Sequence, residues 1–116
     1  MLNIVEEKMD VILNAASDKK ARDIVTLDMR KLTVATDYFI ICSANTTQQV
    51  KAIADNIEKE LAEKEVFFAH KEGYREANWI LLDYGDCVVH VFTEEDRHFY
   101  NLERLWGDAP AKRFEE

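Results

Sequence analysis

The segment 79–92, WILLDYGDCVVHVF, constrains the fold of this chain more than any other part of the sequence. Two apolar runs flank the dipeptide Gly85-Asp86, which is the pattern of a tight β-hairpin. With these two residues at the turn, Tyr84 pairs with Cys87 and the register continues outward to both ends of the segment. We therefore predict two antiparallel strands in a defined register.

The two faces of this hairpin differ in composition, because side chains alternate across a strand. One face is almost wholly apolar and is predicted to lie in the core: Ile80, Leu82, Tyr84, Cys87, Val89 and Val91. The opposite face also carries one carboxylate and one imidazole: Trp79, Leu81, Asp83, Val88, His90 and Phe92. A solvated face would be mostly polar. We therefore expect the second face to be covered by another part of the chain, a ligand or a partner protein.

Apolar periodicity predicts helices and further strands around the hairpin. Strands are expected at 23–29, at 37–42, where the run is buried on both faces, and at 66–70. An amphipathic helix is expected from about residue 2 to 17. A second is expected to run to about residue 64, with Thr46 as its cap and Gln49 reaching back to it.

A last helix is predicted after Thr93, whose hydroxyl can cap it, and Gly107 is expected to stop it. Its inner side is predicted to comprise Phe99, Leu102, Leu105 and Trp106. The resulting order is α-β-β-α-β-β-β-α. A helix between the second and third strands implies a parallel pair, whereas the hairpin is antiparallel. The expected fold is thus α/β (α+β), a five-stranded mixed sheet with flanking helices.

Composition limits the classes of function. A chain of 116 residues fits one domain, and its formal net charge of −8 argues against a nucleic-acid-binding face, which needs clustered Lys or Arg. No apolar run reaches the roughly 18 residues that span a bilayer. The acidic N-terminal segment resembles neither a secretory signal nor a transit peptide, so we expect a cytoplasmic protein. Cys42 and Cys87 lie in apolar runs and show no metal or redox spacing.

Signals for catalysis are weak. Asp83 and Asp86 could bind a metal ion, but they lie three residues apart across a turn and need not converge. His90 shares the face of Asp83 and could form an acid–base pair with it, although a packed or interfacial role fits such a histidine better. His70 and His98 show no ligand spacing with His90, and glycine-rich phosphate loops are absent. We expect no catalytic residues, no metal and no cofactor.

The aromatic residues of the second hairpin face leave two interpretations open. Trp79 and Phe92 pair directly across the hairpin, and large aromatic side chains are the usual anchors of protein interfaces. Alternatively, the first or last helix of the chain covers them. Tyr100 and Trp106 on the last helix present the same choice, with the core favoured.

Two longer segments resemble a known family. They are ATDYFIICSANTTQQVKAIAD (35–55) and, at the expected distance, NWILLDYGDCVVHVFTEEDRHFYNLERLWGDA (78–109). Together they are similar to the ribosomal silencing factors, also called Iojap-like proteins. The resemblance implies a single Iojap-like domain over residues 1–109, followed by a charged C-terminal tail at 110–116. It also implies a core related to nucleotidyltransferases but without their catalytic set.

The function implied by this resemblance is repression of translation without catalysis. Such factors dock on the large ribosomal subunit through its protein number fourteen, a basic protein, and prevent joining of the small subunit in starved or stationary cells. The acidic surface of this chain suits a basic partner: nine acids and four bases follow from residue 79 onward. No specificity for nucleic acid and no membrane association are expected.

On this basis we predict a docking patch of Trp79, Leu81, Asp83 and His90, supported by Phe92 and Tyr100. Two alternatives remain at the level of sequence. One is a degenerate Mg²⁺-dependent nucleotidyltransferase that uses Asp83 and Asp86. The other is a homodimer of the free protein that hides the aromatic face.

Overall fold

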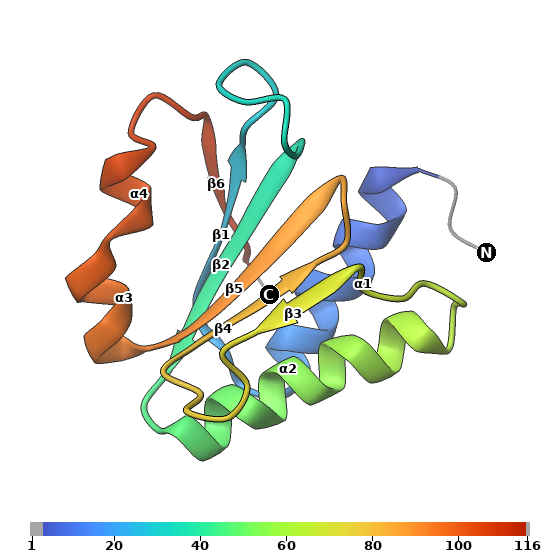
Figure 1. The fold of residues 1–116 in the computed structure, drawn as a ribbon, viewed down its shortest axis with the longest axis vertical. Helices are drawn as coiled ribbons and strands as arrows, with labels where there is room; N and C mark the ends of the chain where they lie inside the picture. Colours follow the sequence, from blue (N-terminus) through green and yellow to red (C-terminus); the bar gives the residue numbers. More distant parts are fainter. Residues whose placement is uncertain (1–3, 116) are drawn as a thin grey trace.

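The computed structural model describes residues 4–115, which form a sheet with helices on both sides (Figure 1). In chain order the elements are α1 (Val5–Asp18), β1 (Arg22–Asp28), β2 (Tyr38–Ala44), α2 (Thr47–Ala62), β3 (His70–Glu72), β4 (Trp79–Asp83), β5 (Cys87–Thr93), α3 (Glu94–Tyr100), α4 (Leu102–Leu105) and β6 (Ala111–Arg113). The predicted start of the first helix at residue 2 lies outside the described residues. None of the described helices is long and apolar enough to cross a membrane.

The strands form one mixed sheet in the order β3-β4-β5-β2-β1-β6. The central neighbours β2 and β5 are parallel, and every other neighbouring pair is antiparallel. The predicted fold class is therefore confirmed. The predicted register of the hairpin is confirmed as well, since Trp79 lies opposite Phe92, and Leu82 opposite Val89.

The predicted number of five strands is wrong, because β6 adds a sixth strand at the edge beside β1. Ala111, Lys112 and Arg113 form it, within the residues that we expected to be a charged tail. All three side chains are exposed, so the strand pairs through its backbone and shows no apolar pattern. Phe114, which follows, packs against the main core.

The two sheet faces are covered differently. α1 and α2 pack on one face and enclose the larger core, whereas α3 and α4 lie on the other side (Figure 1). All six residues predicted for the core face of the hairpin are buried against α1 and α2. A smaller cluster lies on the second face: Leu27, Met29, Ile41, Phe92, Leu102 and Ala109.

The third predicted strand is displaced along the chain. We expected residues 66–70, but β3 spans His70–Glu72. Phe67 and Phe68 are exposed, and the chain first bonds to the sheet where the amide of Ala69 donates to the carbonyl oxygen of Asp83 at 2.8 Å. Among the described residues, no strand pairs with the apolar run at 66–68, although its composition is that of a strand.

The last helix is broken into α3 and α4 at Asn101. This residue has a left-handed backbone (φ 46°), and its side chain accepts a hydrogen bond from the amide of Arg104. Asparagine tolerates this conformation better than most residues. The break turns Phe99 and Leu105 outward, 77% and 69% exposed, so their predicted inward orientation is wrong. Leu102 is buried as predicted.

The predicted helix caps are confirmed in their main features. The hydroxyl of Thr46 accepts from the amide of Gln49 at the start of α2, and that of Thr93 accepts from the amide of Asp96 at the start of α3. The side chain of Gln49 does not reach back to the cap as expected, since it donates to the carbonyl oxygen of Lys19.

Candidate functional site

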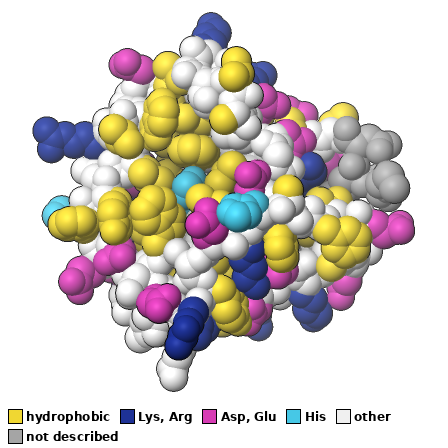
Figure 2. All heavy atoms as spheres, in the orientation of Figure 1, with side chains coloured by type: hydrophobic (Ala, Val, Ile, Leu, Met, Phe, Trp, Pro, Cys, Tyr) yellow, Lys and Arg dark blue, Asp and Glu magenta, His cyan; other side chains and the backbone are white. Residues whose placement is uncertain are grey.

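The second sheet face carries a surface that the helices of the chain cover only in part. Hydrophobic side chains gather across the middle of the view in Figure 2, next to histidine and acidic side chains. Of the six predicted docking residues, His90 and Phe92 are buried, at 4% and 0% exposure. Trp79, Leu81 and Asp83 are half-buried, and Tyr100 is 46% exposed. Their burial therefore increases from the edge of the patch toward β5.

An aromatic cluster forms the centre of this surface. The ring of Trp79 stacks on Phe92 with centroids 4.9 Å apart, and it also contacts Tyr100 from α3 at 4.8 Å. Ring contacts of this kind contribute about 0.5–1.5 kcal/mol beyond the area they bury. Phe92 forms a rigid base, whereas Trp79 and Tyr100 remain accessible. The last helices cover part of the aromatic face and leave the rest open.

His90 is a packed, neutral residue within this cluster. Burial lowers its pKa from 6.5 to about 4. Its Nδ1 atom accepts a hydrogen bond of 3.1 Å from Nε1 of Trp79, so the proton of the neutral ring lies on Nε2. The Nε2 atom has no hydrogen-bond partner among the described residues, and the ring packs edge-on against Phe39 at 4.6 Å. The imidazole orients Trp79 and does not contact Asp83 by a hydrogen bond.

The two aspartates of the hairpin are held by local contacts. One carboxylate oxygen of Asp83 accepts from the amide of Gly85 at 2.8 Å, which stabilises the turn. Asp86 forms an ion pair of 2.9 Å with Lys8 of α1. Within residues 4–115, no group of three or more His, Cys, Asp or Glu side chains could hold a metal ion. The geometry thus gives both carboxylates structural partners.

The pairing of β4 with β5 shows where the other predicted docking residues, Leu81 and Asp83, lie. Leu81 lies opposite His90 on β5, and Asp83 lies opposite Val88. On the other side of β4, His70 lies opposite Asp83 at the sheet edge and pairs with Glu72 at 2.9 Å. The patch thus extends from the aromatic cluster to a polar, charged edge.

Four further residues belong to this surface and were not among the predicted docking residues. Phe39 and Trp106 pack edge-to-face with ring centroids 6.2 Å apart. The exposed Phe99 packs edge-to-face against Tyr100 at 5.0 Å, and the exposed Leu105 ends α4 directly before Trp106. The alternation in β2 puts Phe39 and Ile41 on one face. Only the parallel pairing of β2 with β5, in which Ile41 lies opposite His90, shows that this face is the one that carries the predicted docking residues.

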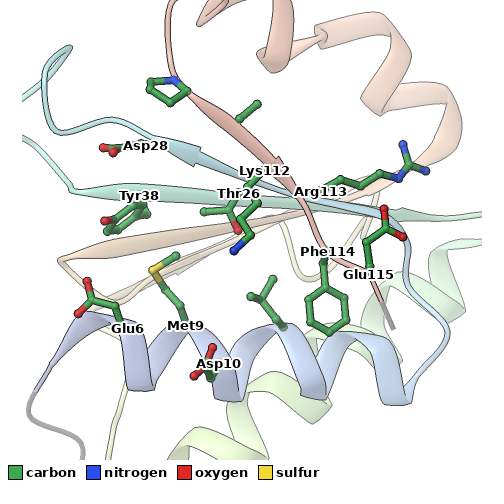
Figure 3. A pocket seen from close by; sticks show the side chains of 13 residues that line it. Glu6, Met9, Asp10, Thr26, Asp28, Tyr38, Lys112, Arg113, Phe114 and Glu115 are labelled. Atoms are coloured by element: carbon green, nitrogen blue, oxygen red, sulfur yellow. The ribbon is translucent and has the colours of Figure 1, made fainter.

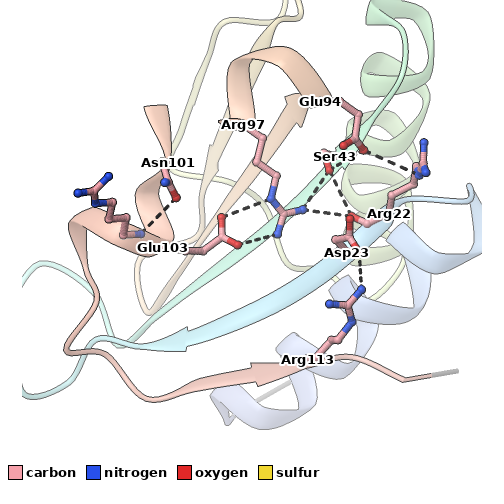
Figure 4. A network of polar contacts seen from close by, with 9 residues as sticks. Arg22, Asp23, Ser43, Glu94, Arg97, Asn101, Glu103 and Arg113 are labelled. Carbon is pink, nitrogen blue, oxygen red and sulfur yellow. Dashed lines mark hydrogen bonds and ion pairs between the residues drawn. The ribbon is translucent and has the colours of Figure 1, made fainter. Parts of the chain in front are cut away.

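A polar network fixes α3, which carries Tyr100, to the sheet (Figure 4). The guanidinium of Arg97 donates to Oγ of the buried Ser43 on β2 at 3.0 Å and to the carbonyl oxygen of Arg22 at 3.2 Å. It also forms a two-bond ion pair with Glu103 of α4, at 3.3 and 3.0 Å. The hydroxyl of Ser43 donates to Glu94 at 3.0 Å. This network determines where the helical border of the surface lies.

Comparison with known proteins decides the family. The sequence profile described as "Ribosomal silencing factor during starvation" matches residues 3–116. The chain belongs to the ribosomal silencing factor family. It is 44% identical to Ribosomal silencing factor RsfS of Halalkalibacterium halodurans over 95% of this chain and 94% of that protein. It is 49% identical to RsfS of Bacillus subtilis over 83% of this chain and 81% of that protein.

A solved structure supports the same assignment. The crystal structure of a Chromobacterium violaceum protein superposes with a TM-score of 0.88 at 35% identity, covering 90% of this chain and 88% of that chain. The predicted resemblance is therefore confirmed. As a ribosomal silencing factor by family, the chain is a regulator of translation, and family membership indicates a regulatory factor rather than an enzyme.

Proposed function

We propose that this silencing factor docks on the large ribosomal subunit and sterically blocks the small subunit, which represses translation in starved or stationary cells. One observation carries the proposal: the half-buried Trp79 and the exposed Tyr100 form an aromatic surface on a sheet face that α3 and α4 leave open. Buried anchors with an accessible rim are typical of protein interfaces. The proposed place of action is the cytoplasm, where bacterial ribosomes are found.

Charge supports a basic protein of the large subunit as the partner, namely the protein number fourteen that the family resemblance implies. The chain has a formal net charge of −8. Glu94, Glu95 and Asp96 occupy the first turn of α3, the helix that carries Tyr100, and Asp83 lies at the end of β4. Complementary charge increases the rate of encounter and disfavours wrong partners.

The structure allows a division of roles within the predicted patch. Trp79, Leu81, Asp83 and Tyr100 are accessible, so we assign them the direct contacts. His90 and Phe92 are buried and act from below, by holding the indole of Trp79 through a hydrogen bond and a stacked ring. Steric obstruction needs no bond making or breaking.

A subunit-joining assay with purified ribosomes tests the proposal. The wild type should keep the subunits apart, whereas Trp79→Ala should lose most of this activity. Because Trp79 also packs within the protein, Tyr100→Ser serves as a second variant at a more exposed position. Val34→Ala is the matched control, since this fully exposed apolar side chain lies in the loop between β1 and β2. Folded Trp79→Ala and Tyr100→Ser proteins with full potency would refute the assigned patch.

We also propose that two copies of the free protein associate through the same aromatic face when no ribosome is present. Sedimentation velocity over a range of concentrations tests this. Under the proposal, the wild type shows a concentration-dependent dimer and Tyr100→Ser shifts the equilibrium toward monomer. A dimer that is unaffected by Tyr100→Ser and Trp79→Ala would place the contact elsewhere.

A further inference from the structure

A cleft of about 650 Å³ lies between α1 and the β1–β6 edge, on the sheet face opposite the docking patch (Figure 3). Its apolar lining includes Met9 and Leu13 of α1, Tyr38 of β2, and Phe114. All four side chains are half-buried, so apolar surface remains accessible inside the cleft. Neither the docking patch nor the Arg97 network uses this space.

The backbone at one border of the cleft is open to another strand. The carbonyl oxygen of Pro110 accepts from the amide of Asp28, and the amide of Phe114 donates to the carbonyl oxygen of Ile24. In an antiparallel pair every second residue faces the neighbouring strand. The amides and carbonyls of Ala111 and Arg113 therefore point away from β1, at the free edge of the sheet.

The charges around the cleft favour a basic occupant. Glu6 and Asp10 of α1 are exposed at its rim, and neither carboxylate forms an ion pair among the described residues. Two other charges of the lining are already neutralised, because Asp28 pairs with Arg30 at 2.7 Å and Arg113 pairs with Asp23. Lys112 is a basic residue of the lining that opposes these acids in charge. The carboxylates of α1 lie across the cleft from it, as Figure 3 shows.

We propose that this cleft binds an extended, apolar and positively charged segment of a partner protein, which adds to the sheet as a further strand beside β6. The backbone of the segment pairs with Ala111 and Arg113. Its apolar side chains contact Met9, Leu13 and Phe114, and its basic side chains approach Glu6 and Asp10. Recognition by strand addition gains affinity from the main chain and specificity from alternate side chains.

A second copy of this chain is a poor occupant. Pairing β6 with another β6 would bring Lys112 and Arg113 near their own copies, and like charges on adjacent strands are destabilising. Charged side chains at a sheet edge commonly prevent such self-association. Because the cleft and the docking patch lie on opposite faces, this proposal does not depend on the ribosome-binding proposal, and both surfaces can be occupied together.

NMR titration of the full chain tests the proposal with a synthetic peptide, Lys-Lys-Val-Leu-Val-Lys-Lys. The expected result is saturable shift changes at the methyl groups of Met9 and Leu13, with slower hydrogen exchange at the amides of Ala111 and Arg113. The double variant Glu6→Gln/Asp10→Asn should weaken binding by roughly threefold to tenfold, as expected for two exposed charge pairs. The matched control Glu63→Gln/Glu65→Gln, which removes two exposed acids that follow α2, should leave binding unchanged.

Three outcomes would overturn the proposal. The peptide Glu-Glu-Val-Leu-Val-Glu-Glu could bind as tightly as the lysine peptide, which would remove the charge argument. The shift changes could lie outside the cleft or fail to occur. Concentration-dependent changes at Met9 and Ala111 in the free protein would instead assign the cleft to a second copy.

Discussion

Nε1 of Trp79 donates a hydrogen bond of 3.1 Å to Nδ1 of His90, so an accessible indole on β4 is held by a buried imidazole on β5. This bond requires the unprotonated form of Nδ1. Protonation of His90 would replace an acceptor by a second donor that faces the indole N–H. The orientation of the proposed anchor therefore depends on the neutral state of a buried histidine.

We predict that this histidine makes the folded state sensitive to acid. The pKa of His90 is lowered from 6.5 to about 4 by burial, so between these values the unfolded chain binds the proton and the folded chain does not. Above pH 6.5, His90 is neutral in both states and does not affect the free energy of unfolding. As the pH decreases toward 4, only the unfolded chain takes up the proton, so the free energy of unfolding falls by about 3 kcal/mol in total. Urea unfolding across this pH range measures the slope.

The matched variant for this prediction is His90→Asn, whose amide can accept from Trp79 but does not titrate. Other carboxylates contribute to acid denaturation in both proteins, so the difference between the two pH profiles isolates His90. The variant should show a shallower loss of stability between pH 6.5 and 4. Parallel profiles for the two proteins would contradict a depressed pKa at this position.

The Arg97 network should contribute strongly to stability. Arg97→Ala removes a side chain that is 11% exposed and leaves the carboxylate of Glu103 and the hydroxyl of Ser43 without this partner. Breaking such a pair costs about 3 kcal/mol. The control is Arg30→Ala, whose 57% exposed side chain pairs with Asp28 and should cost under about 1 kcal/mol. Similar losses in the two variants, measured by urea unfolding, would refute the special role of Arg97.

Two glycines provide a test of backbone packing behind Trp79. A methyl group on Gly73 would collide with the carbonyl oxygen of Trp79, and the residue has φ 80°. Gly73→Ala should therefore cost about 3 kcal/mol and weaken the docking patch. Gly85 has φ 86° but open space around it, so Gly85→Ala should cost only about 1 kcal/mol. Thermal unfolding of both variants gives the comparison, and equal losses would count against the clash.

Metal binding separates the regulatory interpretation from the enzymatic alternative. Asp83 already accepts from the turn amide of Gly85, and Asp86 already pairs with Lys8. We expect Mg²⁺ to leave the melting temperature unchanged, and Asp83→Asn to have the same effect with and without Mg²⁺. Saturable stabilisation by Mg²⁺ that disappears in Asp83→Asn would favour the nucleotidyltransferase-like alternative.

The hairpin could be predicted from the sequence because the residues that determine it are close together in the chain. Gly85 supplies the turn, and strict alternation on either side determines which residues share a face. β6 could not be predicted in this way. It consists of three exposed residues, two of them charged, and it exists because a free edge of β1 lies beside it. Likewise, β3 begins only where the chain meets β4, after an apolar run that pairs with no strand among the described residues.

The sequence predicted which residues lie together in the candidate site better than it predicted which of them are buried. Trp79, His90, Phe92 and Tyr100 do contact one another, as their shared face and the following helix suggested. The burial of His90 and Phe92, however, depends on where α3 and α4 lie. That position is determined by the left-handed Asn101 and by the contact of Arg97 with Ser43, two features that join distant parts of the chain.

The parallel pairing of β2 with β5 also affects how the molecule is made. β2 leaves the peptidyl-transferase centre well before its central neighbour, and α2, β3 and β4 are synthesised between them. Until β5 has emerged from the exit tunnel, the flank of β2 that pairs with β5 presents unpaired backbone N–H and C=O groups, because β1 pairs with the opposite flank. A nascent chain of this silencing factor must therefore complete most of its synthesis before its core can close, and pausing ahead of Thr93 would expose it to aggregation or chaperone capture.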